Sequence, residues 1–191
     1  MNRNGLSAVL TVGVLTLLTG VAYPLAVTGL AALMCPRKAS GSLVFRGDRA
    51  IGSALLGQRF SNPAYFWGRD SATLPYPCNP SLSAGSNVGP ANPALLEAVA
   101  RRLGALRSTD PENASPVPVD LVTASASGLD PHISPDAAYY QVRRVSMARG
   151  ASEEAVRALV ETRVEGRTWG VLGEPRVNVL ELNLALDERY P

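Results

Sequence analysis

The chain has 191 residues with 18 Lys and Arg against 16 Asp and Glu, so its formal net charge is +2. This near-neutral balance excludes the strongly basic surface that binding to nucleic acid or to an anionic membrane would demand. Two cysteines and one histidine do not make a disulfide framework or a metal site, so we expect neither. Cys35 and Cys78 could pair in an oxidising compartment, but the sequence does not show whether they lie close together.

The N-terminal region carries the strongest signal in the sequence, a long apolar run. Between Arg3 and Arg37 no side chain is charged, and most residues are Leu, Val or Ala. Because about 20 apolar residues in a helix cross a bilayer, the run predicts a transmembrane helix over about 6–34, within an N-terminal region 1–36. A cleaved signal peptide is the alternative, but its apolar segment is usually only ~7–15 residues long.

Two features of the run bear on its geometry and orientation. Pro24 lies inside it, removes a backbone donor and predicts a kink. Positive charges flank it on both sides, at Arg3 and at Arg37 and Lys38, so charge alone does not fix the orientation. A single span without a charged pathway cannot transport a solute alone, so we expect partner subunits.

Residues 37–191 have the size of one compact soluble domain. We expect extended segments over 42–45 and 51–60, followed by a long irregular stretch from Asn62. A helix is predicted to begin at Asn92, because asparagine is a good N-cap and the following proline suits the first helical position. Its expected buried face contains Leu95, Leu96, Val99, Leu103 and Leu106, with Arg101, Arg102 and Arg107 on the outer side.

The C-terminal third predicts two more helices and a strand. The cap-then-proline pair at Ser134 starts a helix that ends near Gly150, and a further helix follows Ser152 and stops at Gly166. From Arg176 to Leu184 apolar and polar residues alternate, which predicts a half-buried strand. The hydroxyl-rich residues 120–127 are expected to form a strand or a tight loop. The predicted fold class is α+β: one N-terminal transmembrane helix followed by a single mixed soluble domain with loop-rich segments.

No segment matches a familiar enzyme site, and no catalytic residue is predicted. The Gly85-x-x-x-Gly89 spacing lacks the lysine and the preceding strand of a phosphate-binding loop. The spacing of Asp120, Asp130 and Asp136 fits no calcium loop, and their positions are those of turn and cap residues. The single histidine, His132, is expected to be a hydrogen-bonded structural residue.

Several blocks of sequence nevertheless resemble a known family. They are LVTASASGLDPHISP at 121–135 and GEPRVNVL at 173–180, with GQRF at 57–60, PAYF at 63–66 and GSNVGPAN at 85–92. In this order they resemble the C subunit of the Kdp-type potassium-transporting P-type ATPase, the KdpC family, over the whole chain including the N-terminal span. The chain departs from the family pattern at Asp70 and Arg143, where proline is frequent.

The resemblance implies a non-catalytic subunit of an ATP-driven, high-affinity potassium importer. The implied partners are a channel-like potassium-binding subunit, an ATP-hydrolysing P-type subunit, a small single-span subunit and membrane lipid. The implied location is the cell (inner) membrane, with the soluble domain outside the cytoplasm. Family members are described as raising the ATP affinity of the hydrolysing subunit, so the one cofactor implied is ATP, reached through that subunit. From another class, a membrane-anchored periplasmic hydrolase or ligand-binding domain remains the competing hypothesis.

Two sets of site residues follow from the resemblance. A loose likeness to the signature loop of ABC-type ATPases makes weak nucleotide candidates of Ser83, Gly85, Ser86 and Asn87. The expected partner-facing residues are Ser125, Ser127, Gly128, Asp130, His132, Glu174 and Arg176. We also expect Asp120, Asp130 and Glu174 to raise the local potassium concentration modestly by electrostatic focusing.

Overall fold

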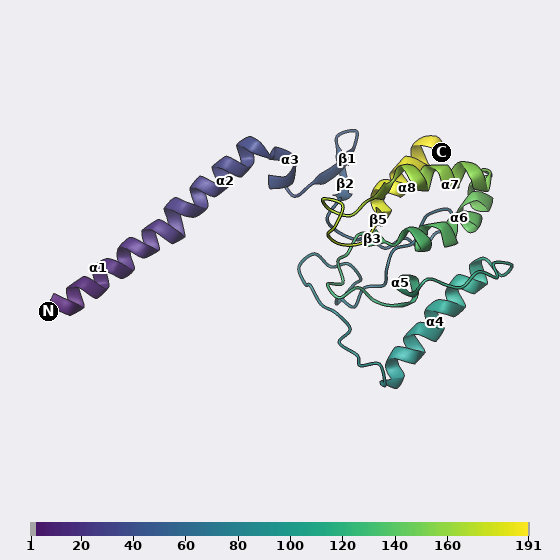
Figure 1. Ribbon diagram of the computed structural model, residues 1–191, viewed down its shortest axis with the longest axis horizontal. Helices are drawn as coiled ribbons and strands as arrows, with labels where there is room; N and C mark the ends of the chain where they lie inside the picture. Colours follow the sequence, from purple (N-terminus) through teal and green to yellow (C-terminus); the bar gives the residue numbers. More distant parts are fainter. Residues whose placement is uncertain (1–2, 191) are drawn as a thin grey trace. The chain divides into compact units, whose positions relative to one another are not determined.

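The computed structural model describes residues 3–190 and is shown in Figure 1. The chain divides into two compact units, one up to Leu43 and one from Val44 onward. The first unit is helical, whereas the second combines helices with two small sheets and long irregular segments. The α+β class predicted from the sequence is therefore confirmed.

The first unit consists of one long helix and a short one. Helix α1 (Arg3–Leu17), a π-helical turn (Leu18–Ala22) and α2 (Tyr23–Met34) follow without interruption, and α3 (Pro36–Ala39) comes after them. The helix α1, the π-helical turn and α2 together make a 32-residue helix, Arg3–Met34, which is long and apolar enough to cross a membrane. A helix thus covers the predicted range 6–34 and begins slightly earlier, whereas its crossing of a membrane stays a prediction.

The disturbance predicted at Pro24 takes the form of the π-helical turn. In a regular helix the proline ring clashes with the carbonyl four residues earlier, at Gly20. Here the turn just before the proline is widened, and the N–H of Tyr23 donates to the carbonyl of Leu18, five residues back. The wider turn separates the ring from the preceding carbonyls, so the helix continues past the proline.

The second unit contains two antiparallel sheets. Strands β1 (Leu43–Arg46) and β2 (Arg49–Ser53) pair with each other, and β3 (His132–Ile133), β5 (Arg176–Asn178) and β4 (Val164–Glu165) form a sheet in that order. The register pairs His132 with Asn178 and Val164 with Val177. The small sheet therefore joins three segments that are distant in sequence.

Five helices complete the described part of the second unit: α4 (Pro93–Thr109), α5 (Val119–Val122), α6 (Pro135–Arg149), α7 (Glu153–Thr162) and α8 (Val179–Arg189). The predicted N-caps Asn92 and Ser134 are confirmed, because each side chain accepts a backbone N–H of the first turn, and Ser152, predicted only to precede a helix, caps α7 in the same way. Helices α6, α7 and α8 lie side by side (Figure 1). Their facing side chains form the core, including Val142, Val145, Val156, Val160, Leu182 and Leu186.

Three predicted elements are wrong in part. The strand expected from Arg176 to Leu184 ends at Asn178, which caps α8 by accepting the N–H of Glu181 at 3.2 Å. Helix α7 ends at Thr162 rather than at Gly166, because the next residues pair with β5 as β4. The extended segment expected over 51–60 is a strand only to Ser53.

The remaining differences concern the segment 120–127 and helix α4. The segment 120–127 begins inside the short helix α5 and continues as a loop. On α4, Leu96 is 66% exposed rather than buried. Arg102, expected on the outer side, instead turns inward, donates to the carbonyl of Val122 at 2.8 Å and pairs with Asp70.

Polar side chains on the core helices hold the irregular segment 63–69 in place. Asn183 of α8 accepts the N–H of Phe66 at 2.8 Å and donates to its carbonyl at 2.9 Å. Gln141 of α6 makes the same pair of bonds with Trp67, at 2.7 and 3.1 Å. Arg144 donates to the carbonyls of Pro63 and Tyr65. Side-chain amides therefore bond this backbone as a neighbouring strand would.

Candidate functional site

An open groove of about 600 Å³ lies on the second unit, where the start of α6 and the strands β3 and β5 come together. Its charged lining comprises Arg69, Asp120, Asp130, Asp136, Glu174 and Arg176, with His132 beside them. We call it the acidic groove. Four of the residues predicted to face a partner, Asp130, His132, Glu174 and Arg176, thus lie in one place, although their part in partner contact stays a prediction.

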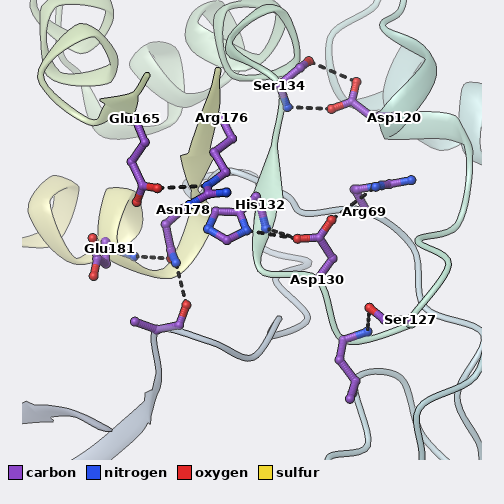
Figure 2. Close-up of polar contacts among 12 residues, drawn as sticks. Arg69, Asp120, Ser127, Asp130, His132, Ser134, Glu165, Arg176, Asn178 and Glu181 are labelled. Carbon is purple, nitrogen blue, oxygen red and sulfur yellow. Dashed lines mark hydrogen bonds and ion pairs between the residues drawn. The ribbon is translucent and has the colours of Figure 1, made fainter. Parts of the chain in front are cut away.

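Asp130 is the most constrained carboxylate of the groove, as Figure 2 shows. Its carboxylate accepts the backbone N–H of His132 at 3.0 Å and lies 3.1 Å from Nδ1 of the same histidine. It also accepts a hydrogen bond from the guanidinium of Arg69 at 3.2 Å. Burial by itself raises the pKa of Asp130, but the bonds from His132 and the charge of Arg69 outweigh it and lower that pKa overall. The carboxylate is therefore ionised at neutral pH and fixed in direction.

Two more carboxylates of the groove, Asp120 and Glu174, also have partners. Asp120 accepts the N–H of Ser134 at 2.7 Å and its hydroxyl at 3.2 Å (Figure 2). Glu174 pairs with Arg167 at 2.6 Å. These contacts leave the groove acidic but partly neutralised, which limits the focusing of potassium expected from the sequence; that focusing stays a prediction.

The groove does not assemble a hydrolytic site. An aspartate and a histidine lie together at 130 and 132, but the neighbouring hydroxyl, that of Ser134, bonds Asp120 instead. Within the described range 3–190, no three His, Cys, Asp or Glu side chains converge to hold a metal ion. The arrangement suits recognition of a polar surface rather than bond breaking.

Residues 125–128 lie apart from the groove lining and are only partly accessible. Ser125 is 3% exposed, and its N–H donates to the carbonyl of Asp70 at 3.0 Å. Gly128 is buried as well, whereas Ser127 is exposed and its hydroxyl accepts the N–H of Leu129 (Figure 2). Of the three predicted residues within 125–128, Ser127 alone presents its side chain on the surface.

The weak nucleotide candidates pack against this same loop. Ser83 donates its hydroxyl to the carbonyl of Ser127 at 3.1 Å, and the N–H of Ala84 donates there at 3.0 Å. A Cβ at Gly85 would lie 2.7 Å from the carbonyl oxygen of Ala126. The glycine is thus explained by the close approach of two backbones. A phosphate placed there would meet carbonyl oxygens, which repel anions, while Ser86 and Asn87 remain exposed.

Gly128 gives a direct test of this packing. Its φ is +68°, and an added Cβ would lie 2.6 Å from the carbonyl oxygen of Ala84. We expect Gly128→Ala to destabilise the second unit by about 2–3 kcal/mol, because left-handed strain and a backbone clash act together. Urea unfolding of the full chain in detergent, followed by tryptophan fluorescence, measures the loss. Gly89→Ala, where no atom lies within 4 Å of the added Cβ, is the matched control and should change little.

Sequence reasoning missed Arg69 and the pairing of Asp70 with Arg102. Arg69 reaches Asp130 across 61 positions and also donates to the carbonyl of Ala124 at 3.2 Å. Such distant pairs leave no periodicity or spacing to detect. The one available signal was Asp70, noted above as a departure from the family resemblance, which pairs with Arg102 of α4.

Comparison with known proteins places these observations in a family. Residues 5–188 match the family model described as "KdpC: K+-transporting ATPase, c chain". Proteins named "Potassium-transporting ATPase KdpC subunit" are 60% identical in Dechloromonas aromatica (91% of each chain) and 58% identical in Variovorax paradoxus (98% of this chain and 97% of the relative). The relative from Polaromonas naphthalenivorans is 62% identical over 178 residues, covering 93% of this chain and 91% of its own. The chain belongs to the KdpC family and is an accessory rather than a catalytic subunit of a potassium-transporting ATPase.

Proposed function

We propose that this chain assembles and stabilises an ATP-driven potassium importer from the membrane. The observation that carries the proposal is the helix from Arg3 to Met34, which is predominantly apolar and has no side chain buried inside the structure. Its surface therefore requires lipid or neighbouring helices. One helix cannot enclose an ion pathway, so its contribution to transport is exerted on partner subunits.

The partners we propose are the potassium-binding channel-like subunit, the ATP-hydrolysing P-type subunit and the small single-span subunit. The relatives are named as subunits of a potassium-transporting ATPase, which supports a complex of this kind. The acidic groove offers such partners a polar surface that is fixed in part, because three of its four carboxylates, Asp120, Asp130 and Glu174, are held by donors. Among these, Asp130 is bonded by His132 and Arg69, and Asp120 by Ser134.

Any effect on ATP is proposed to be indirect. The polar groups of Ser83 and Ala84 donate to the carbonyl of Ser127, and Gly85 is backed by another carbonyl, so the segment offers little to a triphosphate. We propose that the chain favours ATP binding by the hydrolysing subunit through the stability of the complex, with no nucleotide of its own. The second unit is proposed to lie outside the cytoplasm, at the potassium entrance, where cytosolic ATP is absent.

Co-expression of this chain with the other pump subunits tests the proposal. We expect the chain to co-purify with a tagged ATP-hydrolysing subunit, to show no hydrolytic activity when purified alone, and to lower the KM for ATP of the complex. A single cysteine placed at the exposed Ser127, in a chain with Cys35 and Cys78 replaced, should react with an impermeant reagent in intact cells. If the chain were absent from the purified complex, the proposed assembly role would be wrong. If the cysteine at position 127 reacted only after lysis, the proposed location outside the cytoplasm would be wrong.

A further inference from the structure

The loop between β4 and β5 presents an exposed apolar tip at residues 169–172, which the preceding function leaves unexplained. Trp169 is 87% exposed, Val171 71% and Leu172 54%. Three large apolar side chains on one short turn are unfavourable in water unless something covers them. We call this segment the 169–172 tip.

The backbone of the tip is held rigidly by its own hydrogen bonds. Thr168 and Leu172 exchange two backbone bonds, of 2.9 and 3.0 Å, and Gly170 donates to the carbonyl of Arg167 at 3.0 Å. Within this turn Trp169 adopts a φ of +54°, a region that costs free energy for a bulky residue. The turn therefore holds the indole outward before any partner is present, which reduces the ordering cost of binding.

The charges around the tip distinguish between a lipid and a protein as its partner. The base of the turn is closed by the ion pair of Arg167 with Glu174, and Arg176 pairs with Glu165. Glu174 and Arg176 also line the acidic groove, whose described lining holds four carboxylates against two arginines. An acidic surface beside the tip is repelled by anionic lipid headgroups. An apolar centre with a charged rim is the anatomy of a protein interface, where tryptophan is a frequent hot spot.

We propose that the 169–172 tip is the apolar anchor by which the second unit docks onto a membrane-embedded subunit of the pump. The expected receiving site is an apolar pocket with basic or N–H-donating groups on the side that meets the acidic groove. This inference rests on the proposed assembly function and adds to it the contact that carries the binding energy.

Photo-crosslinking in the co-expressed complex tests the anchor. The photoreactive amino acid p-benzoylphenylalanine replaces Trp169 in one variant and Leu96, another exposed apolar residue on α4, in the control. Irradiation of intact membranes should give an adduct at position 169 whose second component, identified by mass spectrometry, is another subunit of the same pump. An adduct with lipid, an adduct with a second copy of this chain, or no adduct while the complex is intact would each overturn the anchor. Absence of the wild-type chain from the complex would instead count against the proposed function.

Substitution at the tip gives an independent measure. Trp169→Ser should weaken retention of the chain on the tagged complex by about 30-fold, the effect of losing an interface hot spot, whereas Trp169→Phe should retain most of the binding. Leu96→Ser is the matched control and should leave retention unchanged. Because the side chains of Trp169 and Leu96 are both exposed, all three variants should unfold at the same urea concentration as the wild type. Unchanged retention of Trp169→Ser would overturn the proposal.

Discussion

Replacing Arg144 with alanine is expected to destabilise the second unit by about 3 kcal/mol. Its guanidinium donates to the carbonyls of Pro63 and Tyr65, bonds Gln141 at 2.7 Å and stacks 4.2 Å from the ring centre of Trp67. Burial lowers the pKa of Arg144 to about 10, opposed by the charge of Asp110, so it still carries its charge at neutral pH. Alanine removes this donor from the carbonyls of Pro63 and Tyr65, leaves Gln141 with the N–H of Trp67 alone, and opens a cavity.

Urea unfolding of the full chain in detergent, followed by the fluorescence of Trp67, measures this loss. Arg101→Ala is the matched control, because Arg101 is exposed on α4, and its change should stay within about 0.5 kcal/mol. Arg144→Lys should fall between the two, since an ammonium group cannot bond the carbonyls and the amide in one plane. A loss below about 1 kcal/mol for Arg144→Ala would show that the loop is held by other contacts.

Placing two arginines in the middle of the long helix is expected to release the chain from the membrane. Leu15→Arg and Leu18→Arg each add about 3–4 kcal/mol to the free energy of insertion, so together they add about 6–8 kcal/mol. The chain expressed without other subunits should then move from the carbonate-resistant membrane fraction to the supernatant. Quantitative immunoblotting of the two fractions measures the shift.

The matched control keeps the same two positions apolar. Leu15→Phe with Leu18→Phe should leave the chain in the membrane fraction, because phenylalanine inserts about as well as leucine. Sequencing the N-terminus of the mature wild-type protein completes the test. A mature chain that starts after Met34 would identify the run as a cleaved signal, and retention of the double-arginine variant would contradict a membrane anchor.

The fold was predictable where a local signal agrees with the final packing. Asn92, Ser134 and Ser152 start helices because each cap acts within its own first turn. The segment after Asn178 was misread because its apolar residues alternate as in a strand. In the structure both faces of α8 are largely covered, so Leu180 and Leu182 are each buried, and the alternation carries no information about one exposed face.

The residues of the candidate site that lie within the two family-like blocks were predictable, whereas the residue that comes from a distant segment was not. Asp130, His132, Glu174 and Arg176 stand in the two blocks of sequence that carried the family resemblance, and the sheet that pairs β3 with β5 brings those blocks together. Arg69 comes from an irregular segment whose position depends on Gln141 and Asn183, and such side-chain to backbone bonds have no sequence period. The exposure of Trp169 was equally invisible, because a tryptophan in a sequence is more often half-buried.

The hydrogen bonds of the Asn183 and Gln141 side-chain amides couple the helical core to the acidic groove through a short stretch of backbone. The two side chains belong to different helices, α8 and α6, yet they hold consecutive peptide groups, at Phe66 and Trp67. Arg69, two residues further, holds Asp130. If α6 moved along α8, these two adjoining peptide groups would be pulled in different directions. The guanidinium of Arg69, which lines the acidic groove, would then be displaced. Conversely, a partner that displaces Asp130 in the groove would shift Arg69 and, through the same hydrogen bonds, the relative position of α6 and α8.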